Sequence, residues 1–333
     1  MPVHLRGRSL LSIDDLDARE IRLLLRLAQD LKAAKYAGTE RPQLERKNIA
    51  LIFEKDSTRT RSSFEVAAYD QGARVTYLGP SGNQLGHKET MKDTARVLGR
   101  LYDAIEYRGF EQNAARELAE HSGVPVYNGL TDEAHPTQAL ADCLTMSEFT
   151  HKHLSDLSVV FVGDVGNNVA HSLALCGLKL GVDVRLCGPR SCWPNTKRLD
   201  HLEQVARDRR TFLRLSDKPE EVVPEADFVY TDVWLSMGED KDLWEERIAA
   251  LRPYRVDKEL MALTGTYHAK FMHCLPAFHN ADTTLGASIA TEFGIDCLEV
   301  TDDVFESEAS IVFDQAENRM HIIKALLVAT LGG

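Results

Sequence analysis

The sequence predicts an α/β fold with two doubly wound domains, each built on a parallel sheet, and an active site in the cleft between them. Short apolar stretches with strand character alternate with longer helical patterns along the whole chain, which is typical of parallel sheets covered by helices on both faces. The 333 residues suffice for two such domains at roughly 150 residues each. Polar segments follow several predicted strands, and the ligands of open α/β sheets bind beyond such strand ends.

Both halves of the chain carry this alternation. Helix start signals and leucines at helical spacing predict a first helix at 12–36. Strands are predicted at 48–54, 74–79, 103–108 and 124–129 in the first half, and at 157–164, 182–189, 226–234 and 270–276 in the second. Helices are predicted at about 90–101, 137–149 and 167–180, and a long helix at about 316–331 closes the chain.

Composition and charge argue against several classes of function. The formal net charge of −12 disfavours nucleic-acid binding, because a phosphate backbone needs a basic face. No apolar run approaches the roughly 20 residues of a membrane span, and the N-terminal segment lacks the pattern of a signal peptide. The six cysteines are scattered without a CxxC pair, which favours reduced thiols. We therefore expect a cytoplasmic protein that binds neither nucleic acid nor membrane.

The segment Ser57-Thr58-Arg59-Thr60 lies where a predicted strand leads into a helix. Free amide groups at a helix N-terminus, hydroxyl donors and one guanidinium can together hold a phosphate. A helix-capping box with surface arginines is the alternative, and the pattern alone leaves both interpretations open. The segment lacks the Gly-Lys pair of a P-loop, so it does not indicate a nucleoside triphosphate.

Arg108 ends the third predicted strand, and His135-Pro136-Thr137-Gln138 begins a helix. The imidazole, hydroxyl and amide of the second segment can polarise a carbonyl and hold the amide nitrogen of a carbamoyl group. A surface ion pair for Arg108, and a turn with Pro136 at the first helical position, are the alternatives. A zinc site at His135 is disfavoured, because no second ligand lies at helical spacing.

The segment GDVGNN, residues 163–168, forms a predicted strand-to-helix loop. It lacks the G-x-G-x-x-G pattern, which disfavours binding of a dinucleotide such as NAD. Asn168 at the predicted helix start can bind a substrate carboxylate or serve as the N-cap.

Asp232 and Cys274 follow two further predicted strands. An aspartate at a strand end can bind an α-ammonium group or stabilise a turn, and the loop that follows it contains Ser236 and Met237. Cys274, which precedes Leu275, can be a nucleophile, a hydrogen-bonding group or a small buried hydrophobe. We expect no metal site among the neighbouring histidines, because period-2 alternation sends adjacent strand residues to opposite faces.

Taken together, these segments resemble the ornithine carbamoyltransferase family. The resemblance rests on FEKDSTRTRSSFE, YLGPSGNQLGHKET, DAIEYRG, NGLTDEAHPTQALAD, FVGDVGNN, DVWLSMGE, HCLPAFH and ENRMHIIKALLVATLG, which appear in the family's order over almost the whole chain. STRT and HPTQ are shared with aspartate carbamoyltransferases, whereas SMG and HCLP are more specific to the ornithine branch. The loop GDVGNNVAHS departs from the family pattern, which has an Ala-Arg pair and a Met there.

The resemblance implies a role for each domain and each site residue. Residues 1–148 would bind carbamoyl phosphate, residues 149–318 would bind L-ornithine, and the last helix, about 319–333, would pack back on the first domain. The carbamoyl phosphate site would comprise Ser57, Thr58, Arg59, Thr60, Arg108, His135, Pro136, Thr137, Gln138, Cys274, the Leu275 carbonyl and Arg319. Gln84 would reach into the site of a neighbouring subunit in a homotrimer, and the ornithine site would comprise Asn168, Asp232, Ser236 and Met237.

The implied reaction is direct attack of the ornithine δ-amine on the carbamoyl carbon, which yields L-citrulline and phosphate. A free alkyl amine has a pKa of about 10.4, so the amine must first lose a proton. Asp232 and Cys274 would orient this amine, while Arg108 and His135, with Thr60, would stabilise the oxyanion on the carbonyl oxygen. The chemistry requires no metal and no organic cofactor.

Three other functions compete with this interpretation. The same chemistry could use putrescine or aspartate, but putrescine lacks the α-carboxylate that would make Asp232 and SMG useful, and aspartate would need more cationic residues. A non-catalytic binding protein is disfavoured by the joint presence of Arg59, Arg108, His135 and Cys274. A nicotinamide-dependent dehydrogenase is disfavoured by the missing glycine fingerprint.

Overall fold

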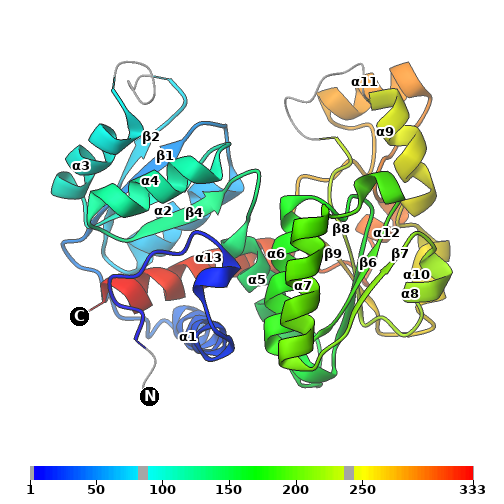
Figure 1. The fold of residues 1–333 in the computed structure, drawn as a ribbon, viewed down its shortest axis with the longest axis horizontal. Helices are drawn as coiled ribbons and strands as arrows, with labels where there is room; N and C mark the ends of the chain where they lie inside the picture. The colour runs from blue at the N-terminus through cyan, green and yellow to red at the C-terminus, as the bar shows by residue number, and fades with distance from the viewer. Residues whose placement is uncertain (1–3, 82–88, 236–243, 333) are drawn as a thin grey trace. The chain divides into compact units, whose positions relative to one another are not determined.

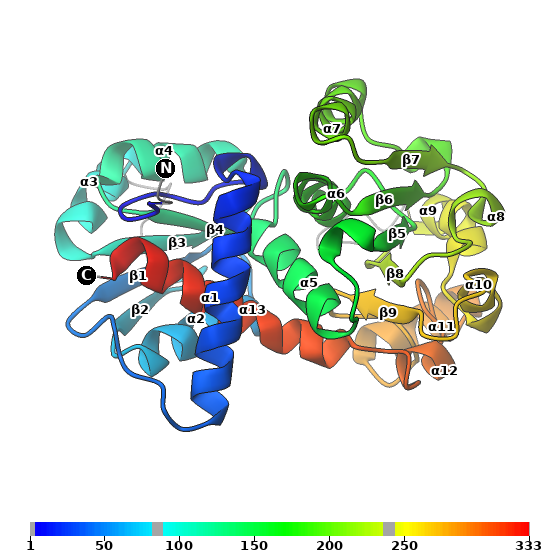
Figure 2. The ribbon, with the colours of Figure 1, turned by 90° about the horizontal axis from the view of Figure 1, so that it is seen from below.

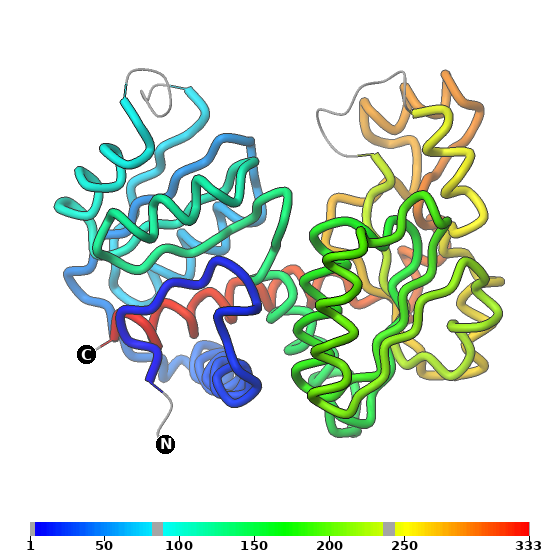
Figure 3. Tube along the Cα trace, in the orientation of Figure 1, coloured from blue at the N-terminus to red at the C-terminus, as the bar shows by residue number. Residues whose placement is uncertain are grey.

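The computed structural model describes residues 4–81, 89–235 and 244–332, and the chain divides into two compact units. The first unit comprises Met1–Thr145 and Ala316–Gly333, and the second comprises Met146–Gln315. Both described ends of the chain belong to the first unit, where the Gly7 amide donates to the Thr330 carbonyl over 2.9 Å (Figure 3).

A four-stranded parallel sheet in the order β2-β1-β3-β4 forms the centre of the first unit (Figure 1). Its strands are β1 (Asn48–Phe53), β2 (Arg74–Leu78), β3 (Ala104–Arg108) and β4 (Val126–Leu130). The associated helices are η1 (Ile13–Asp15), α1 (Ala18–Tyr36), α2 (Arg59–Asp70), α3 (Met91–Leu101), α4 (Gln112–Ser122), α5 (Pro136–Glu148) and α13 (Val312–Leu331).

The alternation of side chains along β3 decides what each face of this sheet contacts. Helices α3 and α4 lie on one face, and α1, α2 and α13 lie on the other (Figure 2). Tyr107 belongs to the apolar cluster that the sheet forms with α3 and α4. Because strand side chains alternate between faces, Glu106 and Arg108 point to the opposite face, toward α2 and α13.

The second unit contains a five-stranded parallel sheet in the order β7-β6-β5-β8-β9. Helices α6 and α7 lie on one face of this sheet, and α8, α10 and α12 lie on the other (Figures 1 and 2). The strands are β5 (Ser158–Val162), β6 (Asp183–Cys187), β7 (Leu213–Ser216), β8 (Phe228–Thr231) and β9 (Lys270–His273). The helices are η2 (Leu154–Asp156), α6 (Asn168–Leu180), η3 (Arg190–Cys192), α7 (Thr196–Arg209), α8 (Pro219–Val222), α9 (Trp244–Leu251), η5 (Arg252–Tyr254), α10 (Lys258–Leu263), α11 (Thr284–Phe293) and α12 (Asp302–Phe305).

The predicted fold class is confirmed, with parallel sheets covered by helices on both faces, but several boundaries were wrong. The predicted helix at 12–36 is a short 3-10 turn followed by α1, because the Asp17 side chain caps a new helix start and Glu20 bonds back to the Asp17 amide. The strand β7 was not predicted, since two of its four residues are polar and most of it is only partly buried. No helix in the described ranges combines the length and apolar character needed to cross a membrane.

Candidate active site

The first unit brings two guanidinium groups onto one hydroxyl. Thr60, the second residue of α2, is completely buried. Arg108, the last residue of β3, donates from Nη1 to Thr60 Oγ1 over 2.8 Å, and Arg319 of α13 donates to the same oxygen. We call these three residues the arginine cluster. Three separate elements thus concentrate positive charge near the start of a helix, where an anion is favoured.

The structure does not form the capping box that was the alternative interpretation of the STRT segment. The side chain of Thr58, at the N-cap of α2, makes no capping hydrogen bond. Glu65 pairs with Arg61 over 2.9 Å rather than returning to the helix start, so the capping box is not formed. Ser57 Oγ instead accepts from the Thr60 amide over 3.3 Å. The helix start therefore keeps the hydroxyl-rich, cationic character that a phosphate site needs.

His135 immediately precedes α5, whose first residue is Pro136. Burial, together with the positive charges of Arg319 and Arg108, holds the pKa of His135 well below its ordinary value. The imidazole is therefore neutral near pH 7 and can donate one N–H to a carbonyl oxygen. Gln138 is also buried, and its amide donates to Asp142 Oδ1 over 2.8 Å.

Glu106 is a charged residue of this region that the sequence analysis missed. It lies fully buried on the same face of β3 as Arg108, and neither carboxylate oxygen has a hydrogen-bond partner among the described residues. Burial raises the pKa of Glu106 well above its ordinary value, although Arg108 and Arg319 oppose the shift. Gly129 of β4 makes room for it, since a Cβ there would lie 2.0 Å from Glu106 Oε1. Its position two residues before Arg108 was the available signal.

The second unit brings together Asp232 and Cys274 from the ends of two neighbouring strands. Cys274 Sγ lies 3.0 Å from Asp232 Oδ1, and the Val233 amide donates to the same oxygen over 2.8 Å. Burial raises the pKa of Asp232, while His273 and the hydrogen bond from Cys274 act in the opposite direction. Asp232 is thus a carboxylate whose ionisation depends on its neighbours.

The loop before α6 corrects one expectation about the asparagines. The N-cap of α6 is Asn167, whose side-chain oxygen accepts from the Ala170 amide over 2.8 Å, so Asn168 is the first helical residue. The side-chain Nδ2 of Asn167 donates to Asp232 Oδ2 over 3.2 Å. Asn167, which the sequence analysis did not single out, therefore joins the loop after β5 to the proposed ornithine site.

A buried pair, His273 and Glu299, supports the HCLP segment, and the sequence analysis did not identify it. His273 Nε2 lies 3.3 Å from Glu299 Oε1, and both side chains are completely inaccessible. His273 Nδ1 accepts from the Leu275 amide over 2.9 Å, and Glu299 Oε1 accepts from the Phe278 amide over 2.6 Å. These bonds surround Leu275, whose φ of 59° is a conformation that residues other than glycine rarely adopt. No sequence pattern pairs residues 273 and 299.

The argument against a metal site based on strand alternation was wrong. The strand β9 ends at His273, so alternation does not separate it from Cys274, and Asp232, His273 and Cys274 bring ligand atoms within 4.8 Å of one another. His279, Asp302 and Glu306 form a second such group. The first group already contains the Cys274–Asp232 hydrogen bond, and in the second His279 Nδ1 lies 2.6 Å from Asp302 Oδ1.

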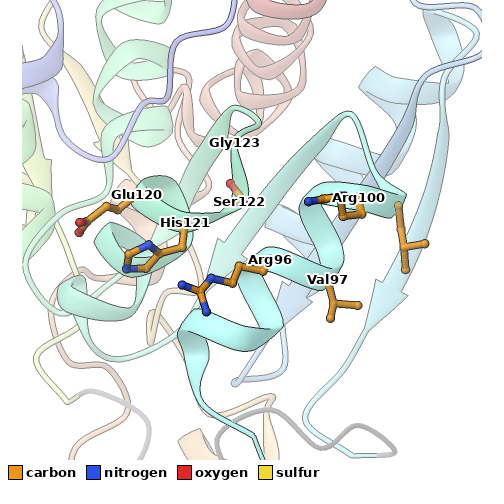
Figure 4. Close-up of a pocket in the computed structure, with 8 residues that line it drawn as sticks. Arg96, Val97, Arg100, Glu120, His121, Ser122 and Gly123 are labelled. Carbon is orange, nitrogen blue, oxygen red and sulfur yellow. The ribbon is translucent and has the colours of Figure 1, made fainter.

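Three predicted site residues, Gln84, Ser236 and Met237, lie outside the described residues. A hollow on the first unit lies apart from all the predicted residues, at the ends of α3 and α4 (Figure 4). These helices approach closely because Gly99 has no side chain; a Cβ there would lie 1.8 Å from the Ser122 carbonyl oxygen. The hollow is lined by Arg96, Val97, Arg100, Leu101, Glu120, His121, Ser122 and Gly123, and we assign it no part in the reaction.

Comparison with known proteins covers almost the whole chain. Residues 8–148 match the carbamoyl-P binding domain of the aspartate/ornithine carbamoyltransferases, and residues 155–330 match their Asp/Orn binding domain. The chain is 56% identical over 333 residues to the Rhizobium meliloti (strain 1021) protein named "Ornithine carbamoyltransferase, catabolic", and 57% identical over 335 residues to a protein of the same name from Burkholderia mallei (strain ATCC 23344). Each match covers 100% of both chains.

A solved structure of ornithine carbamoyltransferase from Pyrococcus furiosus is similar with a TM-score of 0.90 and 43% identity, and the match covers 100% of this chain and 99% of the other. The family match, the full-length relatives and the shared fold agree. The chain belongs to the aspartate/ornithine carbamoyltransferase family.

Proposed function

We propose that this protein transfers the carbamoyl group of carbamoyl phosphate to the δ-amine of L-ornithine, giving L-citrulline and phosphate. The observation that carries the proposal is the arginine cluster, where Arg108 and Arg319 converge on Thr60 at the start of α2. A dianionic phosphate ligand requires such a concentration of donors and positive charge. Ornithine rather than aspartate is supported by the names of the full-length relatives that are 56% and 57% identical.

In this proposal the first unit binds carbamoyl phosphate. The hydroxyls and the guanidinium of the STRT segment hold the phosphate, and Arg108 and Arg319 bind its oxygens or the carbonyl oxygen. His135, as a neutral imidazole, donates to the carbonyl oxygen, where negative charge develops during attack. Pro136 begins α5, and Thr137 and Gln138 lie in its first turn to hold the carbamoyl nitrogen.

The second unit binds ornithine in this proposal. Asp232 pairs with the α-ammonium group or orients the amine, and Cys274 keeps the carboxylate of Asp232 oriented through the 3.0 Å contact. Asn168, with Ser236 and Met237, is assigned to the remaining polar groups of the amino acid. Cys274 and the Leu275 carbonyl also take part in binding the carbamoyl end.

The reaction then proceeds without a covalent enzyme intermediate. The neutral δ-amine attacks the carbamoyl carbon, a C–N bond forms, and the electron pair of the carbonyl moves to its oxygen. Collapse of this intermediate breaks the bond to the bridging oxygen, and the departing phosphate accepts the proton from the amine. Arg108 and His135 lower the barrier by stabilising the oxyanion, which is usually the largest single catalytic contribution.

We also propose a homotrimer whose sites are shared between subunits, with Gln84 of one chain completing the site of the next. The polar, glycine-containing segment 80–88 and the family membership support this arrangement. A cytoplasmic location is supported by the state of the cysteines: all six lie in described residues and are thiols rather than disulfides.

The test is a citrulline assay with the purified chain. Carbamoyl phosphate is supplied with ornithine, putrescine or aspartate in parallel reactions, and each carbamoylated product is quantified. The proposal predicts that kcat/KM with ornithine exceeds that with either alternative amine by at least a hundredfold. A preference for putrescine or aspartate would contradict the proposed substrate while leaving the family membership intact.

A further inference from the structure

Arg247 joins two loops of the second unit that follow neighbouring strands. It lies on α9, and its Nε donates to the Trp234 carbonyl while its guanidinium also donates to the Asp164 carboxylate. Asp164 follows β5 and Trp234 follows β8, and these two strands are paired in the sheet. The side chains of Arg247 and Asp164 are only 26% and 15% exposed, so the pair is partly shielded from water.

On the β5 side, Asp164 shapes the turn that presents Asn167. Asp164 Oδ1 accepts from the Gly166 amide over 3.2 Å, and the Asp164 carbonyl accepts from the Asn167 amide over 3.4 Å. The side chain of Asn167 accepts the capping bond from the Ala170 amide through Oδ1. This directs its Nδ2 to Asp232 Oδ2, 3.2 Å away. The orientation of the Asp232 carboxylate thus depends on the turn that Asp164 folds.

On the β8 side, Arg247 acts on the backbone that carries Asp232. Trp234 lies two residues after Asp232, its side chain is completely buried, and its carbonyl accepts from Arg247. The other carboxylate oxygen of Asp232 accepts from Val233 and Cys274. The guanidinium of Arg247 therefore bonds to both loops that orient Asp232, to one through Asp164 and to the other through Trp234.

We propose that Arg247 is a positioning residue for ornithine binding, which acts by holding Asp232 in place through Asp164 and Trp234. This inference rests on the proposed function, because Asp232 is there the partner of the amino-acid substrate. The planar guanidinium of Arg247 presents its donors to the two acceptors in a rigid arrangement, whereas the ammonium group of a lysine is a compact point charge on a flexible stem. Trp234 and Asp164 both belong to the second unit, to which the proposed function assigns ornithine.

The fold does not depend on Arg247 alone. Arg198 donates to the Gly166 carbonyl over 2.9 Å and holds the same turn from α7. Trp234 remains packed in an apolar cluster with Trp244, Ile248 and Leu251. Replacement of Arg247 by an uncharged residue of similar length should therefore leave the protein folded while the Asp232 carboxylate loses its fixed orientation.

The test compares Arg247→Met, Arg247→Lys and Asp164→Asn with the wild type. Arg207→Met is the matched control, because it removes an exposed arginine–carboxylate pair on α7 of the same unit. Arg247→Met and Asp164→Asn should each raise KM for ornithine at least tenfold and change KM for carbamoyl phosphate less than twofold. Arg247→Lys should recover part of the loss, and Arg207→Met should leave both values unchanged.

Two outcomes separate positioning from other roles. If Arg247 itself bound the substrate carboxylate, Asp164→Asn would release its charge and keep or improve ornithine affinity, which would overturn the inference. Positioning through Asn167 further predicts that Arg247→Met raises KM for ornithine by a smaller factor in an Asn167→Ala background than in the wild type, because only the route through Trp234 then remains. Equal rises of both KM values with a large fall in Tm would mean a purely structural role. Failure of the wild type to form citrulline would instead contradict the proposed function.

Discussion

The thiol of Cys274 donates a hydrogen bond to the Asp232 carboxylate across 3.0 Å, from the end of β9 to the end of the neighbouring strand β8. The two residues are 42 positions apart in the sequence. This contact identifies Cys274 as a hydrogen-bond donor in the structure described here. It also makes the ionisation of Asp232 depend on the thiol, because the hydrogen bond lowers the pKa that burial raises.

Cys274→Ala should therefore make kcat/KM for ornithine fall at a higher pH than in the wild type when the pH is lowered. Loss of the donor removes a contribution that lowers the Asp232 pKa, so Asp232 is protonated at a higher pH and activity is lost earlier as the pH falls. The measurement is kcat/KM for ornithine against pH. Cys274→Ser, whose hydroxyl can still donate to Asp232, should restore the wild-type pH dependence of kcat/KM at acid pH. An unchanged pH dependence in the alanine variant would show that the contact does not control the ionisation of Asp232.

Arg108→Met should reduce kcat/KM for carbamoyl phosphate at least tenfold. It removes a charged donor from the arginine cluster, and loss of such a partner of a charged ligand costs about 2–5 kcal/mol, where 1.4 kcal/mol is a factor of ten. Arg116→Met, which removes an exposed arginine paired with Glu133 at 3.4 Å, is the control and should be neutral. Near-normal kcat/KM in Arg108→Met would remove Arg108 from the phosphate site.

Glu106→Gln should stabilise the protein progressively as the pH rises. Burial raises the folded-state pKa of Glu106 above its unfolded value of about 4.3. The neutral carboxyl is thus tolerated at low pH, and stability is lost as the pH rises toward the folded-state pKa. The difference in the free energy of unfolding between Glu106→Gln and the wild type, measured with denaturant, should grow as the pH rises above about 4.3. The exposed Glu120→Gln should show no such trend.

Lys324→Met should destabilise the first unit by about 3–5 kcal/mol. Lys324 is completely buried on α13 and lies 2.6 Å from Glu40 and 2.7 Å from Asp70. In the variant Glu40 would lose this ammonium group, and Asp70 would keep only its pair with Lys35. Burial would raise the pKa of Asp70, but the hydrogen bonds from Lys324 and Lys35 outweigh it and the pKa is lowered. This stabilisation is present above about pH 4 and is lost as the pH falls below it.

Denaturant unfolding across acid pH checks this prediction. The wild type should lose stability more steeply than Lys324→Met as the pH falls below 4, because the variant has already lost the Lys324–Asp70 interaction. The control is Lys218→Met, whose ammonium group pairs with Glu221 on the surface at 3.0 Å. Equal slopes for the wild type and Lys324→Met would contradict the role given to the buried lysine.

Mixed trimers test whether the site is shared between subunits. Arg59→Ala and Gln84→Ala proteins should each be nearly inactive alone. If Gln84 serves the neighbouring chain, co-refolding of equal amounts should restore roughly one quarter of the sites. A site is then intact only where a chain with an intact Arg59 lies beside a chain with an intact Gln84, and the two kinds of chain pair independently under closed symmetry. A mixture no more active than its parents would mean that each subunit uses its own Gln84.

The sequence by itself determined the fold class and the family. Both are encoded locally: strand and helix signals lie within short windows, and STRT, HPTQ and HCLP are contiguous. Only the tertiary structure decided that Arg319 meets Thr60, 259 positions away, and that Glu299 and Arg247 support the strand ends of the second unit. The structure also identified Asn167, rather than Asn168, as the N-cap of α6. These contacts depend on how distant elements pack, and no periodicity or local motif records which buried side chains will share a partner.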